Sequence, residues 1–168
     1  MMDESRAKTL DTVAVAALIA LWAQTLESLP SLPDMVATRF AFDGYPAVYG
    51  SKFVFLILPV VATFMWSGTW LALRTGYMKL NVPFAVPEDR IAAIRPLYEY
   101  LQRLVRVELL VGFVALQSVA LESARNDRLV SGFAGIIGAI IVVTIALVSW
   151  FIYRVWTIAR GGPSTGSG

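Results

Sequence analysis

The sequence contains no cysteine and no histidine. The chain can therefore form no disulfide, thiolate nucleophile, cysteine-ligated cluster or histidine-ligated haem. It also lacks the common zinc sites and any Ser-His-Asp arrangement. Carboxylates remain as ligands for hard cations, but they form no dense cluster along the chain. We expect a non-enzymatic protein with no metal and no cofactor.

Charged residues are few as well, at 15% of the chain against about 25% in soluble proteins. Hydrophobic residues make up 57%, and the mean hydropathy is +0.66. The net charge is only +2, and the basic residues are spread between hydrophobic runs, so they do not predict nucleic-acid binding. The composition predicts an integral protein of the lipid bilayer.

Four hydrophobic runs approach the length of about 20 residues that a spanning helix needs. They cover residues 12–29, 53–73, 104–121 and 129–153. We predict an all-α integral membrane protein, with one four-helix bundle domain over residues 1–160 and a Gly/Ser-rich tail or linker over 161–168. Asp3, Glu4 and Asp11 make the start unlike a basic signal peptide, so we expect the first run to be retained as a span.

Lysine and arginine predict the orientation, since cytoplasmic loops carry an excess of them. With the N-terminus inside, ten basic residues lie on the inner side and four on the outer side. We therefore expect both termini in the cytoplasm. Before the third span, Pro87, Glu88 and Asp89 are typical of a helix start. They predict a short cytoplasmic amphipathic helix that ends or kinks near Pro96.

The outer loop between the first two spans, from Pro30 to Lys52, is rich in proline, glycine and aromatic residues. Glycine permits backbone angles that other residues resist, while proline restricts them, so a structured loop is predicted. One interpretation is an extracytoplasmic cap that recognises a peptide or a partner protein. The other is a compact loop that only covers the bundle. The candidate partner-binding residues are Asp34, Arg39, Phe40, Asp43, Gly44, Pro46, Gly50, Ser51 and Lys52.

The spacing of four motifs in this region is distinctive: Leu32-Pro33, Gly44-Tyr45-Pro46, Gly50-Ser51-Lys52 and Pro59. It resembles the membrane domain of unknown function at the N-terminus of SdpI-like, toxin-immunity-type bacterial proteins. The resemblance implies a multi-pass protein of the bacterial cytoplasmic (inner) membrane that sequesters a toxic peptide or senses a partner. Arg39 stands where that family usually has histidine, so a proton switch based on imidazole is not available here.

Glu108 lies inside the third span, where a charge is costly unless it is satisfied. Arg74, at the end of the second span, is its predicted ion-pair partner. A structural ion pair joining two helices is one interpretation. The alternative is a proton or ion relay in a small oligomeric transporter.

The fourth run contains Gly132, Gly135 and Gly138, and small residues at such spacing allow close helix packing. The neighbouring helix could belong to this chain, to a second copy in a homo-oligomer, or to another subunit. The glycines therefore favour an alternative function, that of an accessory subunit in a large respiratory or photosynthetic membrane complex.

Overall fold

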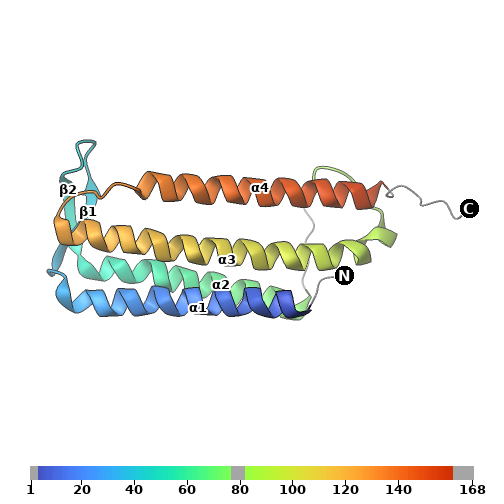
Figure 1. Cartoon of the computed structure of the whole chain (residues 1–168), viewed down its shortest axis with the longest axis horizontal. Helices are drawn as coiled ribbons and strands as arrows, with labels where there is room; N and C mark the ends of the chain where they lie inside the picture. Colours follow the sequence, from blue (N-terminus) through green and yellow to red (C-terminus); the bar gives the residue numbers. More distant parts are fainter. Residues whose placement is uncertain (1–3, 77–81, 161–168) are drawn as a thin grey trace, which may run out of the picture.

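The computed structural model describes residues 4–76 and 82–160, so the predicted tail over 161–168 lies outside the described residues. Four helices run side by side as a bundle (Figure 1). They are α1 (Glu4–Ser28), α2 (Ile57–Thr75), α3 (Glu88–Asn126) and α4 (Phe133–Ala159). The outer loop forms strands β1 (Met35–Phe40) and β2 (Pro46–Ser51), flanked by the 3-10 helices η1 (Leu29–Ser31) and η2 (Lys52–Leu56).

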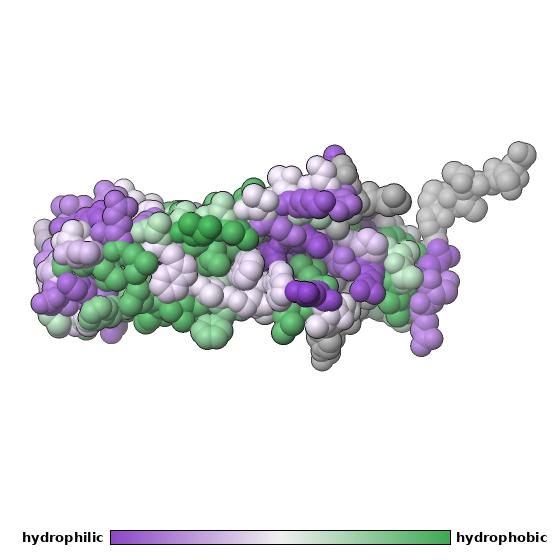
Figure 2. Space-filling view, turned by 90° about the horizontal axis from the view of Figure 1, so that it is seen from below, coloured by the Kyte–Doolittle hydropathy of each residue, from purple (hydrophilic) through white to green (hydrophobic). Residues whose placement is uncertain are grey.

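Each of the four helices, together with its flanking 3-10 turn where there is one, is long and apolar enough to cross a membrane. A helix satisfies its own backbone hydrogen bonds, which the bilayer core requires of any spanning segment. One face of the bundle carries hydrophobic residues along its middle, with hydrophilic residues gathered towards both ends (Figure 2). The number, length and apolar character of the helices confirm the prediction of a multi-pass helical membrane protein.

Helix α3 lies at the centre of the bundle and packs against α1, α2 and α4. Buried residues form three successive clusters along it. Leu121 belongs to the cluster nearest the hairpin, Leu110 to the middle one between α1, α2 and α3, and Leu101 to the one shared with α4. The bundle therefore has an organising helix to which the other three attach.

The separate amphipathic helix before the third span is not observed, because α3 continues from Glu88 to Asn126 with Pro96 inside it. Proline removes one backbone hydrogen bond, which by itself disfavours a continuous helix. Here the residues on both sides are held by packing. Ile94 and Leu101 are buried with Phe151 of α4, so tertiary contacts keep the helix aligned across Pro96.

The outer loop is a β-hairpin, which makes the fold not purely helical. β1 and β2 pair antiparallel as a two-stranded sheet, from Met35 opposite Ser51 to Phe40 opposite Pro46. The register shifts on both sides of Arg39, where the pairing is irregular. The hairpin stands across the end of the bundle where α3 ends and α4 begins (Figure 1).

Candidate partner-binding site at the hairpin

A tight turn over residues 41–45 closes the hairpin. The Ala41 amide donates to the Tyr45 carbonyl oxygen at 2.9 Å, and the Gly44 amide donates to that of Ala41 at 3.0 Å. Asp43 Oδ1 accepts a hydrogen bond from the Tyr45 amide at 3.1 Å. Gly44 has φ +81°, a conformation that glycine adopts without strain. Pro46 is the first residue of β2, a position where a strand tolerates proline.

The base of the hairpin is held by Lys52. Its Nζ lies 3.0 Å from Asp34 Oδ1 and donates to the Leu32 carbonyl oxygen at 3.3 Å. Its backbone amide donates to the Asp34 carbonyl oxygen at 3.1 Å. Next to it, Ser51 Oγ accepts from the Phe53 amide at 3.4 Å and caps η2. These contacts join the two ends of the loop before the chain enters α2.

Gly50 allows the two strands to approach closely. A Cβ atom at this position would lie 2.9 Å from Thr38 Cγ2, which is shorter than any normal contact. Any larger residue would push Thr38 aside beside the irregular pairing at Arg39. The glycine is therefore explained by the hairpin itself.

The turn between α3 and α4 holds the hairpin against the bundle. The Leu129 amide donates to the Gly44 carbonyl oxygen at 3.0 Å. The Tyr49 hydroxyl donates to Asp127 Oδ2 at 2.9 Å. Asp127 ends α3 in the left-handed conformation, with φ 49°. The hairpin and the turn between α3 and α4 are thus joined by hydrogen bonds and form one surface.

The Tyr49 bond predicts a pH dependence. The hydrogen bond to Asp127, followed by desolvation and the Asp127 charge, raises the pKa of Tyr49 above 10.0. The folded chain then holds the phenol proton more tightly than the unfolded chain. The stabilisation is complete below about pH 10 and is lost as pH rises through the folded pKa.

We expect the thermal midpoint of the wild type, followed by circular dichroism, to fall more steeply above about pH 10 than that of Tyr49→Phe. Tyr45→Phe is the matched control. The Tyr45 ring lies 5.6 Å from the Arg128 guanidinium, a contact that phenylalanine retains. Equal slopes for the wild type and Tyr49→Phe would contradict this assignment.

A cavity of about 400 Å³ lies between the hairpin, η2 and the adjoining ends of α3 and α4. Most of its wall is apolar, and the polar groups on it are few, as is usual for sites that bind an apolar group in one orientation. It is lined by Ala37, Thr38, Arg39, Phe40, Val54, Phe55, Gln117, Ala120, Ser123, Leu129 and Phe133.

Gln117 fixes one wall of this cavity. Its side chain is 2% exposed, and Nε2 donates both to Thr25 Oγ1 at 2.9 Å and to the Phe55 carbonyl oxygen at 3.0 Å. One side chain of α3 therefore joins α1 to η2 below the hairpin. A buried side chain held by two such hydrogen bonds keeps one conformation, so this part of the cavity wall is rigid.

Of the predicted partner-binding residues, only Arg39 and Phe40 line the cavity. The others build the turn, the strand contact and the base of the hairpin. The sequence interpretation missed the lining residues that come from α3 and the start of α4, such as Gln117 and Phe133. They are far along the chain from the loop, and a polar glutamine inside a hydrophobic run was the only available signal.

Residues 15–63 match DUF1648, a domain of unknown function. This segment comprises most of α1, the hairpin, η2 and the start of α2, which is less than a third of the chain. Neither the curated proteins nor the solved structures gave a match. The DUF1648 segment therefore contributes the hairpin and η2 side of the cavity. The rest comes from α3, α4 and the turn between them, which lie outside the matched segment.

The predicted ion pair between Glu108 and Arg74 is not formed. Glu108 Oε1 accepts a hydrogen bond from Thr144 of α4 at 2.9 Å, and its buried Oε2 has no partner among the described residues. The Arg74 guanidinium lies 4.9 Å from the centre of the Trp70 ring. In residues 4–76 and 82–160, no group of three acidic side chains is placed to hold a metal ion.

The glycines of the fourth run do not pack against any other part of the described chain. Gly132 precedes α4 with φ +113°, and a Cβ at Gly132, Gly135 or Gly138 would meet no atom within 4 Å in the described part of the chain. Close packing of α3 and α4 occurs instead at Gly112 of α3. A Cβ there would lie 2.6 Å from Ile140 Cδ1.

Proposed function

We propose that this chain is a non-enzymatic multi-pass membrane protein that binds a peptide, or an extended segment of a partner protein, at the hairpin end. The observation that carries the proposal is the cavity of about 400 Å³ between the hairpin and the α3–α4 end. It is large enough for an apolar side chain and has few polar groups on its wall. A toxic peptide, as the SdpI-like resemblance implies, is one ligand of this class.

The position of β1 supports an extended ligand. β1 supplies four residues of the cavity wall, from Ala37 to Phe40, and within the described chain its only strand partner is β2. The outer edge of β1 therefore has no strand paired with it beside the cavity. An added strand would gain main-chain hydrogen bonds there and direct alternate side chains into the cavity.

Exposed side chains around the hairpin indicate which ligand groups would fit. Phe42 at the tip is fully exposed, and Tyr45 and Tyr49 are about half exposed. Aromatic residues that are exposed in this way are common at sites of protein binding. Arg39 is an exposed cation on the cavity wall, which favours a segment with an acidic group near its apolar side chain.

The proposal can be tested with a photo-cross-linker in intact cells. p-Benzoylphenylalanine in place of Phe42 is expected to give a covalent adduct with a peptide or protein, identified by mass spectrometry. Adding Arg39→Glu should lower the yield of that adduct about fivefold, the effect of losing roughly 1 kcal/mol of binding free energy.

The control is the same cross-linker at Phe64, an α2 residue that is 75% exposed and lies within a spanning helix. It should give lipid adducts but not the adduct formed at Phe42. The same adduct at both positions, or a yield at Phe42 that Arg39→Glu leaves unchanged, would contradict binding at the hairpin.

A second candidate is an accessory subunit of a larger membrane complex. It is favoured by the open face of α4, where an added Cβ at Gly135 or Gly138 meets no described atom within 4 Å. Small residues on such a face allow a helix of another subunit to approach closely. Gentle purification from the native membrane separates the two functions, because a single particle of 18.4 kDa plus detergent would contradict the subunit proposal.

A further inference from the structure

A second cavity, of about 300 Å³, lies between α1, α2 and α3 in the other half of the bundle from the hairpin. Figure 1 shows that α1 begins and α2 ends in this half. Three of the lining side chains are arginines and one is a carboxylate, an excess of two positive charges. The cavity is lined by Asp11, Trp70, Leu73, Arg74, Arg103 and Arg106.

Arg106 is the most buried of these arginines, with 2% of its side chain exposed. It donates from one terminal nitrogen to Asp11 Oδ1. Its Nε is also buried and has no hydrogen-bond partner among the described residues. A guanidinium group has five N–H donors, and burying them without acceptors costs free energy. The cavity therefore contains a cation whose donors exceed the acceptors around it.

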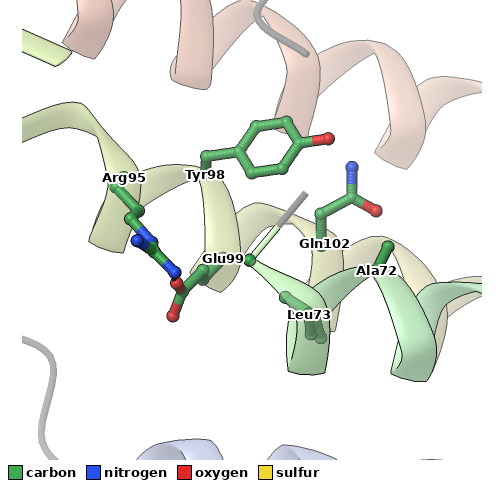
Figure 3. A pocket seen from close by; sticks show the side chains of 7 residues that line it. Ala72, Leu73, Arg95, Tyr98, Glu99 and Gln102 are labelled. Atoms are coloured by element: carbon green, nitrogen blue, oxygen red, sulfur yellow. Dashed lines mark hydrogen bonds and ion pairs between the residues drawn. The ribbon is translucent and has the colours of Figure 1, made fainter. Parts of the chain in front are cut away.

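The carboxylates nearby are already shared between arginines. Arg103 Nε lies 3.5 Å from Asp11 Oδ1, so Asp11 serves Arg103 and Arg106 together. Arg103 also lies 3.9 Å from Glu99 Oε2, but Glu99 is held more closely by Arg95, at 3.1 Å. Figure 3 shows Arg95 beside Glu99 on α3, next to Leu73 of α2. Counting Arg95 and Glu99 with the cavity leaves the excess of two positive charges unchanged.

Arg74 forms no ion pair within the described chain. Its guanidinium lies 4.9 Å from the centre of the Trp70 ring, and both residues line the cavity. The planar guanidinium fork matches the oxygens of a phosphate group and often binds them in pairs. Three guanidinium groups line this cavity with an excess of two positive charges, and the Arg106 Nε has no acceptor among the described residues, which suits a doubly charged oxyanion.

The position in the membrane favours a lipid as the source of that group. The cavity lies on the side that the count of basic residues predicts to be cytoplasmic, where the leaflet is rich in anionic lipids. Trp70 and Leu73 give it an apolar wall beside the arginines, and tryptophan is common at the level of the headgroups. Basic pockets between spanning helices on this side are a known mode of binding lipid phosphate.

We propose that this cavity binds a phosphate group, supplied by the headgroup of an anionic phospholipid, through Arg74, Arg103 and Arg106. The full chain in a neutral detergent can be titrated calorimetrically with dioctanoyl phosphatidic acid. Dioctanoylglycerol has the same chains without the phosphate, and inorganic phosphate supplies the group without the chains. We expect saturable binding of phosphatidic acid and none of dioctanoylglycerol.

Arg74→Gln is the informative variant, because Arg74 is exposed and its loss breaks no ion pair in the described structure. It should weaken the binding of phosphatidic acid about tenfold, the value of one charge-assisted hydrogen bond. Arg160→Gln is the matched control. The Arg160 guanidinium also lies over a tryptophan, 4.3 Å from the Trp156 ring centre, and it does not line the cavity. It should change the affinity less than about twofold.

Competition by inorganic phosphate would support a site for the phosphate group from either source. Binding of phosphatidic acid without such competition would support a site that also requires the lipid chains. Three results would overturn the proposal. They are equal binding of dioctanoylglycerol, equal effects of Arg74→Gln and Arg160→Gln, and no binding of either phosphate compound by a folded chain of normal size-exclusion profile.

Discussion

Replacing Gly112 with leucine is expected to destabilise the bundle by about 2–3 kcal/mol, because the added side chain would overlap Ile140 where α3 packs on α4. A Cβ at Gly112 would lie 2.6 Å from Ile140 Cδ1 and 2.9 Å from Ile140 Cγ1. Leucine would add further atoms to the same space. The loss should exceed the gain of about 1 kcal/mol that leucine brings to a helix interior over glycine. Thermal unfolding of the purified protein in detergent measures the difference.

The control for this prediction is Gly138→Leu in α4. It makes the same chemical change in a spanning helix, but a Cβ there meets no atom of the described chain within 4 Å. The thermal midpoint of this variant should stay the same or rise slightly, from helix propensity alone. If the two variants lose equal stability, Gly112 is not the residue that sets the distance between α3 and α4.

Asp11→Asn is expected to cost about 2–3 kcal/mol, because it leaves Arg106 buried without a counter-charge. Arg106 is 2% exposed, while Asp11 is 47% exposed, and this partial exposure places the effect below the largest values for buried pairs. The asparagine keeps a hydrogen-bond acceptor in place. The measured loss in thermal stability would therefore report mainly the charge.

Glu4→Gln is the control, because it removes a carboxylate from the same helix at a site where its partner is exposed. Glu4 pairs with Lys8 at 2.8 Å, but both side chains are more than 70% exposed, so removing this charge should change stability very little. A double replacement, Asp11→Leu with Arg106→Met, should recover much of the stability lost in Asp11→Asn, since it removes the buried guanidinium together with its half-exposed partner carboxylate. A double variant less stable than Asp11→Asn would contradict this account.

At the hairpin, the local sequence predicts a structured loop but not the two strands. Pro46, Gly44 and Gly50 indicate a structured loop, because their backbone preferences act locally. Strands were not predicted, since their apolar positions do not alternate clearly. Only Val36 and Ala37 of β1 are buried, and they are adjacent in sequence. The strands exist because they pair with each other and because β1 packs on α3.

The polar contacts inside the bundle were predicted least well. The sequence predicts that Glu108 pairs with Arg74, yet Glu108 accepts a hydrogen bond from Thr144 of α4 instead. Nothing in the sequence indicates that Arg106 of α3 contacts Asp11 of α1. Hydropathy places a residue at a depth in the membrane but does not state which side of its helix meets a neighbour. A small rotation of a helix changes its partners while leaving its hydropathy the same.

The sequence alone determined that the chain forms four helices that are long and apolar enough to cross a membrane. Hydrophobic runs of this length must satisfy their backbone hydrogen bonds internally in lipid, and helices do so without other segments. Only the tertiary structure decided which side chains meet. Glu108 and Thr144 are 36 residues apart, and Asp11 and Arg106 are 95 residues apart. Such pairs depend on the rotation and spacing of helices packed around α3. The two candidate sites, the hairpin cavity and the arginine cavity, follow from that packing.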